Sequence, residues 1–217
     1  MTNSMQRPDA GLGGLQSLLD EVRACRHCVT SPQGPPLAHE PRPVLQADVG
    51  ARLLITGQAP GTRVHASGRP FTDPSGERLR VWMGVGEDVF YDPLRVAIVP
   101  MGLCFPGLDA NGGDLPPRRE CAPRWRERIL TELPAIELVL LVGQYAQRWH
   151  LPAGPGRTVT ARVADWEAIW NRPDLPRLLP LPHPSWRNNA WLKANPWFAD
   201  KLLPRLRQEV RQLTQSR

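Results

Sequence analysis

A histidine held between two prolines is the first candidate for chemistry in this sequence. The stretch LPHPSWRN starts at Leu181 and follows a short apolar run. Pro182 and Pro184 fix their own φ angles, and Pro184 also restricts His183 to extended geometry. An imidazole fixed in this way can donate a hydrogen bond in a defined direction. A rigid turn that contains an incidental polar residue is the alternative interpretation.

The segment GQAPGTRVHASGRPF is the second candidate. Gly57 and Gly61 allow close backbone approach, and Pro60 stiffens the loop, so the amides from Gln58 onward have a fixed direction. Phe71 at the end of the segment brings an aromatic ring towards the same loop. Rigid backbone donors beside an aromatic ring suit a pocket for a flat, hydrogen-bonding base. The alternative is an ordinary strand-to-helix loop with the phenylalanine in the core.

The chain has four cysteines. Cys25 and Cys28 form a CxxC pair, and Cys104 and Cys121 follow later in the chain. In a cytoplasmic protein, such a set favours metal binding over disulfides. Four thiolates suit either structural zinc or a [4Fe–4S] cluster. Four unrelated buried thiols remain the alternative.

Length and composition set the frame for these motifs. The chain has 217 residues and suits a single domain over 11–217, preceded by a loose tail over 1–10. No run approaches the ~20 apolar residues of a membrane span, and the N-terminus lacks the apolar segment of a secretory signal. We therefore expect a cytoplasmic protein that does not bind membranes.

The charge is compatible with a polyanionic partner. The formal net charge is +6, and almost all of the 27 basic residues are arginines. Arg118 and Arg119 begin an arginine-rich stretch around Cys121, which could contact DNA phosphates. A solvated helix face explains the stretch equally well, and an arginine-rich genome composition explains the overall charge.

The elements that must position these motifs alternate along the chain. Short apolar runs predict strands over 52–56, 95–99, 137–142 and 177–181. Periodic patterns predict helices over 12–24, 75–84, 123–133, 144–150, 160–170 and 196–213. Pro180 restricts the last strand to a sheet edge or a strand end, and Pro204 should kink or split the last helix.

Strands that alternate with helices predict a three-layer α/β/α domain with a central, mainly parallel, four-stranded sheet. Ligands of such sheets bind beyond the carboxyl ends of the strands. The segments GQAPG, PMGLC, GQYAQ and HPS each directly follow a predicted strand. All four should therefore meet at one edge of the sheet. This favours the interpretation of His183 as a functional residue over that of an incidental turn residue.

GQAPG with GRPF, and HPSWRN near the end, resemble the two signature motifs of the uracil-DNA glycosylase superfamily. The CxxC pair and the two later cysteines resemble the iron–sulfur, family 4-like branch, and the resemblance spans roughly residues 20 to 210. It implies a monomeric DNA base-excision glycosylase that hydrolyses the N-glycosidic bond of uracil or another deaminated base. Cys25, Cys28, Cys104 and Cys121 would then hold a structural [4Fe–4S] cluster, with zinc as second choice.

The resemblance also implies roles for the pocket residues. Phe71 would stack on the flipped base, and His183 would donate a hydrogen bond to the carbonyl oxygen of the leaving base. Gln58, or else His65, would position the attacking water. The loop residues Gly57, Ala59, Pro60 and Gly61 would line the pocket.

The residues that follow the histidine are expected to face DNA. Ser185 would contact a phosphate, and Trp186 or Arg187 would fill the gap that the flipped base leaves in the duplex. Asn188 belongs to the same motif and is also expected to contact DNA. Arg118 and Arg119 are further expected DNA contacts. The partner is single- or double-stranded DNA that carries a damaged base.

The sequence departs from the iron–sulfur branch at three positions. Gln58 stands where glutamate is usual, Pro100 where an asparagine usually reads the base, and His65 where an acidic residue is common. Base recognition would then use backbone groups of residues 100–102, or the side chain of Gln144. A non-catalytic, metal-stabilised module that binds nucleic acid or nucleotides is the alternative function, and a glycosylase for a different damaged base is a third.

Overall fold

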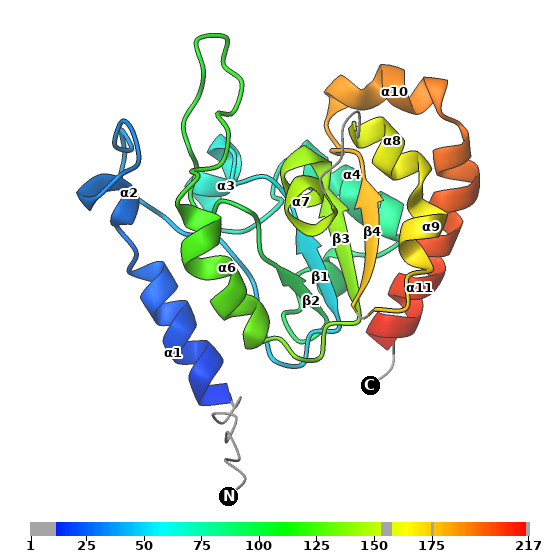
Figure 1. Ribbon diagram of the computed structural model, residues 1–217, viewed down its shortest axis with the longest axis horizontal. Helices are drawn as coiled ribbons and strands as arrows, with labels where there is room; N and C mark the ends of the chain where they lie inside the picture. Colours follow the sequence, from blue (N-terminus) through cyan, green and yellow to red (C-terminus); the bar gives the residue numbers. More distant parts are fainter. Residues whose placement is uncertain (1–11, 153–157, 175, 216–217) are drawn as a thin grey trace, which may run out of the picture.

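A four-stranded parallel sheet forms the centre of the protein, as the sequence predicts. The computed structural model describes residues 12–152, 158–174 and 176–215; the expected N-terminal tail lies outside these residues. The strands lie in the order β2-β1-β3-β4, and their bounds are β1 (Leu53–Thr56), β2 (Val96–Ile98), β3 (Leu138–Val142) and β4 (Arg177–Leu181). With helices on both faces, the fold is the predicted three-layer α/β/α (Figure 1).

The strands form because their side chains are apolar on both faces of the sheet. Every residue of β1, β2 and β3 is buried. Leu53 and Ile55 point to one face and Leu54 to the other, and each face has its own hydrophobic core. Pro180 lies in β4, which is an edge strand of the described sheet, so this prediction is also confirmed.

Four of the six predicted helices, those over 12–24, 75–84, 123–133 and 144–150, begin and end close to the predicted residues. The bounds of the described helices are α1 (Leu12–Arg23), α2 (His27–Thr30), α3 (Thr62–Ser67), α4 (Pro74–Met83), α5 (Glu87–Phe90), α6 (Cys121–Thr131), α7 (Gly143–His150), α8 (Val159–Ala164), α9 (Trp166–Trp170), α10 (Asn189–Ala194) and α11 (Leu203–Gln215). A 3₁₀ turn, η1 (Trp186–Asn188), precedes α10, and a π-helical turn, η2 (Phe198–Leu202), precedes α11. Within the described part of the chain, no helix combines the length and the apolar character that a membrane crossing requires.

Two of the predicted helices are each divided. The helix expected over 160–170 is two helices, α8 and α9, that meet at Asp165. The helix expected over 196–213 is split near Pro204, as predicted, because a proline in the first turn of α11 cannot extend the preceding hydrogen-bond ladder. The short helices α2, α3, α5 and α10 were not predicted, because four to six residues are too few for a periodic pattern.

The helices divide between the two faces of the sheet. α1, α6 and α7 cover one face, where Leu54, Val139 and Leu141 of the strands are buried. α4, α9 and α11 cover the opposite face, and η2 adds Phe198 to that core. Figure 1 shows α1 and α6 side by side at one end of the molecule, with α11 at the other.

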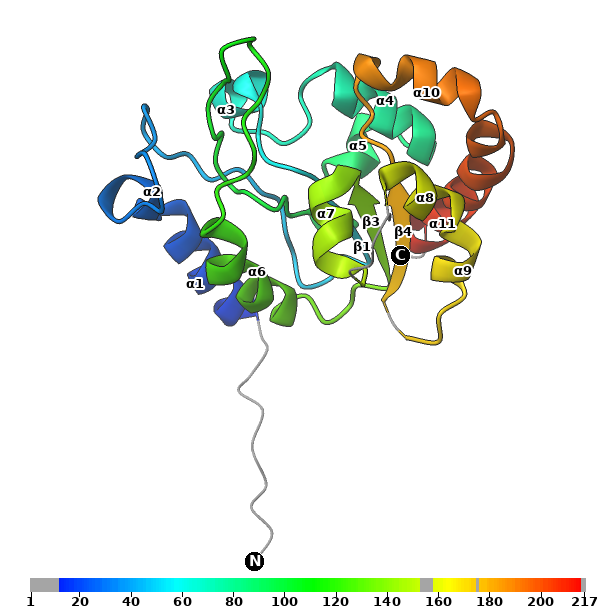
Figure 2. The same ribbon diagram turned by 45° about the horizontal axis from the view of Figure 1, so that its top comes forward.

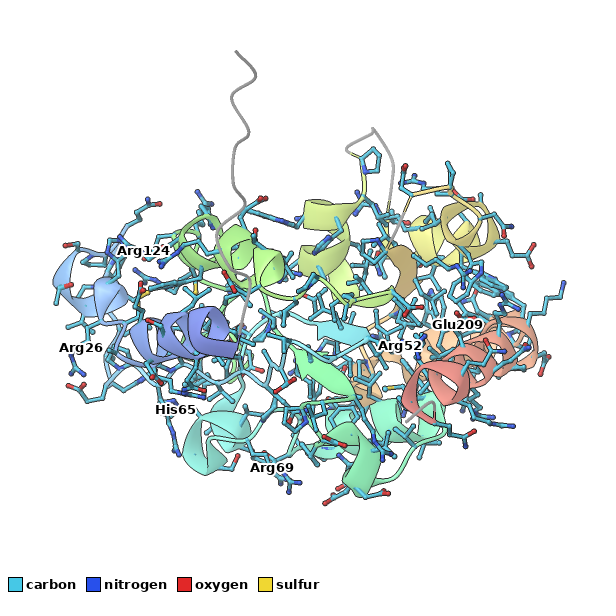
Figure 3. The ribbon with its side chains drawn as sticks, turned by 90° about the horizontal axis from the view of Figure 1, so that it is seen from below. Arg26, Arg52, His65, Arg69, Arg124 and Glu209 are labelled. Carbon is cyan, nitrogen blue, oxygen red and sulfur yellow. The ribbon has the colours of Figure 1, made fainter. Side chains whose placement is uncertain are left out.

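Ion pairs tie the amino-terminal edge of the sheet together. Arg52, just before β1, lies 2.6 Å from Glu137, just before β3. Arg177 at the start of β4 lies 2.6 Å from Glu209 of α11. Figure 3, seen from below, places Arg52 and Glu209 close together at this end. These charged residues therefore serve the edge of the sheet that lies opposite the carboxyl ends of the strands.

A hydrogen-bonded pair, buried Arg126 and partly buried His150, joins α6 to α7. Arg126 donates to Nε2 of His150 at 2.6 Å and to the carbonyl oxygen of Val99 at 3.2 Å. Burial lowers the pKa of Arg126 to about 10, and burial together with the nearby guanidinium lowers the pKa of His150 to about 3. His150 is therefore a neutral acceptor in the folded protein.

We predict that this pair makes the protein acid-sensitive. Because the pKa of His150 is lower in the folded than in the unfolded chain, the unfolded chain binds an extra proton below about pH 6.5. The free energy of unfolding should then fall by up to about 1.4 kcal/mol per pH unit as the pH drops further. His150→Gln keeps an acceptor for Arg126 without a titrating group. Urea unfolding at pH 5 and 7.5 should show a weaker acid effect in this variant, whereas equal acid effects would contradict the assignment.

Candidate active site

A cavity of about 550 Å³ opens at the carboxyl edge of the sheet and is lined by residues of both sequence motifs. It lies where the parallel strands β1 and β4 end, as the rule for open α/β sheets predicts. Figure 2 shows the loops of this edge turned towards the viewer, between α3 and α10. The predicted residues that line the cavity are Gly57, Gln58, Ala59, Pro60, Gly61, Phe71, Pro100, His183, Ser185, Trp186 and Arg187.

The loop after β1 is fixed by backbone pairing with the segment after β2. The amide of Met101 donates to the carbonyl oxygen of Gly57 at 3.0 Å, and the amide of Gly102 donates to that of Gln58 at 2.9 Å. The side-chain amide of Gln58 donates to the carbonyl oxygen of Leu115 at 3.1 Å. Gln58 therefore borders the cavity while its side-chain donor is engaged with a neighbouring loop.

Phe71 has a left-handed backbone, which is rare for an aromatic residue. Its φ is 54°, and it is the one non-glycine residue with positive φ in the described chain. The hydroxyl of Tyr91 donates to its carbonyl oxygen at 3.0 Å. Its ring lies against Gly57, with a Cζ atom 3.5 Å from where a Cβ would stand, and edge-on to Phe90. Such a conformation persists only when its surroundings hold it, and it is typical of functional sites.

His183 is held by groups outside the cavity. The side chain of Asn188 donates to its carbonyl oxygen at 2.6 Å, so Asn188 stabilises the turn. The DNA contact expected of Asn188 stays a prediction. Gly143, with φ of 79°, leaves room for the imidazole, whose Cβ and Cδ2 lie 3.7 Å from where a Cβ would stand. Burial lowers the pKa of His183, although nearby Asp73 acts in the opposite direction. The imidazole is therefore neutral at pH 7 and can donate one N–H.

Two expected site residues lie elsewhere. His65 is on α3, whose Thr62 and Arg63 line the cavity, but its own ring packs against His39 at 4.5 Å and Phe105 at 5.7 Å. Figure 3 places it on the outside of the molecule. Gln144 is exposed on the first turn of α7 and does not line the cavity. The predictions that His65 positions water and that Gln144 reads the base were therefore wrong.

Arg118 does not face solvent as a phosphate contact would. Its guanidinium donates to Glu120 at 2.8 Å and to the carbonyl oxygen of Pro35 at 2.7 Å, and its side chain is 15% exposed. Arg118 therefore joins the segment after α2 to the start of α6, and the prediction that it binds DNA was wrong. Arg119, the next residue, is exposed.

The four cysteines lie around one small cavity of about 20 Å³. Trp125 and Leu103 also line it, and the amide of Leu103 lies 3.3 Å from the Sγ atom of Cys121. Burial raises the pKa of Cys104 and of Cys121 to about 12, so a bound cation would be required to hold either as a thiolate. Among the described residues, no group of three or more His, Cys, Asp or Glu is arranged to hold a metal ion.

Four charged residues of the cavity were missed by the sequence analysis: Arg63, Asp73, Arg78 and Asp114. Arg78 of α4 donates to the carbonyl oxygen of Ser185 at 3.0 Å, and Asp73 caps the start of α4. Asp114 lines the cavity from the loop that follows β2. Asp73 had a detectable signal, because Asp-Pro is a common helix start. Asp114 lies in a polar loop, and no local pattern marks it.

The fold and the cavity together define a class: a three-layer α/β protein with an aromatic residue and a neutral histidine at the carboxyl edge of its sheet. Residues 45–207, more than half of the chain, match the model of the family described as the Uracil DNA glycosylase superfamily. The chain belongs to this superfamily. The match confirms the resemblance that GQAPG and HPSWRN carry, whereas the iron–sulfur branch stays a prediction.

Gly76 is predicted to be essential for the position of Phe71. It lies in α4, and a Cβ at this position would overlap the carbonyl group of Phe71. Gly76→Ala should therefore lower the free energy of unfolding by about 1–3 kcal/mol, the usual cost of overpacking. Gly13→Ala in α1 is the matched control, since nothing described lies within 4 Å of a Cβ there. Urea unfolding of both variants tests this, and equal stabilities would contradict the contact.

Proposed function

We propose that the protein is a DNA base-excision glycosylase that hydrolyses the N-glycosidic bond of uracil or another deaminated base. One observation carries the proposal: Phe71, His183 and the amide-bearing loop after β1 border the same cavity. Membership of the uracil-DNA glycosylase superfamily supports it. An enzyme that acts on a base in a duplex must extract it into such a pocket.

Phe71 is the stacking residue in this proposal. Its ring is fixed between Gly57 and Phe90, so little side-chain entropy is lost when a flat base binds against it. Pro100 lines the same cavity. Because the amides of Met101 and Gly102 already bond to the loop after β1, recognition of a base edge by this segment would use carbonyl groups.

His183 supplies the main stabilisation of the leaving base. When the glycosidic bond breaks, negative charge develops on the base while the sugar becomes oxocarbenium-like. A neutral imidazole that donates its N–H to a base carbonyl oxygen stabilises that charge as it forms. The amides of Gln58 and Ala59 border the same space and assist.

The rim of the cavity provides the DNA contacts. Trp186 is 71% exposed, and the guanidinium of Arg187 lies 5.6 Å from its ring centroid. Both line the mouth of the cavity with Ser185, so they are placed to fill the gap in the duplex and to contact a phosphate. Arg119 is exposed and is proposed as a further phosphate contact, without sequence preference.

A non-catalytic nucleic-acid-binding module is the second candidate. The engaged side chain of Gln58 favours it, because the amide that we expected to position water donates to the carbonyl oxygen of Leu115. Oligonucleotides that carry uracil, hypoxanthine or xanthine, single- and double-stranded, separate the two candidates. Release of any free base supports the enzyme, and DNA binding without release supports the module.

We further propose that Cys25, Cys28, Cys104 and Cys121 hold a structural [4Fe–4S] cluster. The four residues share one small cavity. Zinc is the second choice. A cluster would supply a covalent tie between the α1–α2 region, the segment after β2 and the start of α6, and it takes no part in the reaction.

The metal proposal predicts coloured protein. Anaerobically purified protein should be brown, with absorption near ~400 nm and about four irons per chain. Cys121→Ser should lose the iron and lower the melting temperature, because the tie between α6 and the rest is lost. Colourless protein with one zinc would reject the cluster, and protein with neither metal would reject both proposals.

The catalytic proposal predicts a rate effect specific to His183. Because His183 stabilises charge that develops only in the transition state, His183→Ala should lower the single-turnover rate by ~10²–10³-fold. Affinity for DNA and metal content should not change. Asn188→Ala keeps the imidazole but removes the hydrogen bond to the backbone of His183, so it should lower the single-turnover rate by less than His183→Ala does. An unchanged rate in His183→Ala would make His183 a structural turn residue.

A further inference from the structure

We propose that Asp114 is the group that accepts a proton from the attacking water, and that Gln58 is a positioning residue that holds Asp114 over the cavity. The inference rests on the proposed glycosylase function and assigns a step that no residue of the two sequence motifs performs. It depends on a hairpin between β2 and α6, from Gly107 to Leu115, which we call the 107–115 hairpin. Figure 1 shows this loop, in green, projecting beyond the carboxyl edge of the sheet.

The 107–115 hairpin has a defined structure of its own. The amide of Leu115 donates to the carbonyl oxygen of Gly107 at 2.9 Å, and Leu108 pairs with Asp114 in an antiparallel bridge. At its tip, the carboxylate of Asp109 accepts from the amides of Asn111 and Gly113 at 2.8 and 2.9 Å. Asp114 therefore projects from an ordered backbone and not from an irregular coil.

Asp114 lies directly against the first motif. Its Oδ2 atom is 3.2 Å from where a Cβ on Gly61 would stand. A side chain at residue 61 would crowd this carboxylate, which gives a physical reason for the last glycine of GQAPG. Asp114 lines the cavity together with Gln58, Phe71 and His183, so it borders the space in which the water that attacks a docked nucleotide would lie.

The side chain of Gln58 secures the base of the hairpin. Its Nε2 atom donates to the carbonyl oxygen of Leu115, the residue after Asp114, at 3.1 Å. A carboxylate at position 58 would have no proton to donate there. Gln58 thus holds the residue next to the proposed base, and this contact accounts for an amide at the position.

The charges around Asp114 come from several elements. Asp73 at the start of α4 and Arg187 after β4 act on it directly. Arg63, Arg78 and His183 line the same cavity, and Asp109 lies on the same hairpin. Asp114 is exposed at the rim of the cavity, and the partial burial of its carboxylate, then the field of Asp73, raises its pKa, whereas Arg187 lowers it. A carboxylate with a raised pKa is a stronger base than an ordinary aspartate.

Asp73 is the competing carboxylate, but its position suits another task. Its Oδ2 atom accepts from the amide of Ser75 at 3.4 Å as the cap of α4. This contact ties the carboxylate of Asp73 to the first turn of α4. Its charge instead raises the pKa of both Asp114 and His183.

The step is a hydrolysis and needs no further reactant. The water oxygen forms a bond to the anomeric carbon of the sugar, and the carbon–nitrogen bond to the base breaks, with its electron pair leaving on the base. One water proton passes to the carboxylate of Asp114, and the other remains on the new sugar hydroxyl. The base leaves as an anion that His183 stabilises, and the proton on Asp114 is then lost to solvent or to the base.

The first test is the single-turnover rate of base release by full-length protein on a uracil-containing oligonucleotide. Asp114→Asn should lower the rate by about 10²–10³-fold, within the usual contribution of a general base. Asp109→Asn is the matched control on the same hairpin, because asparagine accepts the same two amide bonds and the residue does not line the cavity. Its rate should equal that of the wild type, and melting temperatures should show that both variants fold.

The second test is the pH profile, which a structural role of Asp114 would not change. The deprotonated form is active, so the wild-type rate should fall as the pH drops through the raised pKa of Asp114. Asp73→Asn keeps the helix cap but removes the charge that raises this pKa, so the acid limb should move to lower pH. Gln58→Ala should lower the rate several-fold with the acid limb in place, since the base is present but less well held.

The outcomes separate the inference from the proposed function. Wild-type protein that releases no base would overturn both. Wild-type protein that releases base, together with an Asp114→Asn variant of unchanged rate and pH profile, would overturn the inference alone. Loss of the acid limb in Asp73→Asn, instead of a shift, would assign the proton transfer to Asp73 and also overturn it.

Discussion

Parallel, in-register pairing of β1, β3 and β4 is the constraint on which the site depends. Thr56 lies opposite Leu141, and Val142 lies opposite Leu181, so these strands end at nearly the same level. The chain therefore leaves the sheet at neighbouring points, and the two motifs meet although more than 120 residues separate them. Close approach at this point also requires Gly143, because its left-handed backbone and missing side chain leave the space that His183 occupies.

The backbones of Phe71 and His183 are held by contacts with neighbouring residues. Tyr91 fixes the backbone of Phe71, and Asn188 fixes that of His183. Arg78 adds a link from α4 to the carbonyl oxygen of Ser185. Preorganisation of this kind is required because misplaced donors stabilise a transition state poorly. The strain at Phe71 is accordingly sustained by the packing of α4 and α5 against it.

The sheet and the meeting of the two motifs were predictable because they rest on local patterns. Continuous apolar runs identify buried parallel strands, and parallel strands share a carboxyl edge. The errors concern side-chain direction and long-range partners. His65 lies on a short helix without periodicity, and the partner of Arg118, Pro35, is 83 residues away in sequence. The role of Asn188 was missed because its side chain contacts the backbone carbonyl oxygen of His183 and not the imidazole.

The electrostatics of the cavity link its chemistry to DNA binding. The charge of Asp73 raises the pKa of Asp114, and the field of Arg187 offsets part of that effect. Arg187 also stands at the rim, where a DNA phosphate would compete for its guanidinium. In the proposed complex, a phosphate that engages Arg187 would weaken the effect of this guanidinium on Asp114 and so raise the pKa of the carboxyl further. The contact proposed to position the duplex would then also make Asp114 a stronger base.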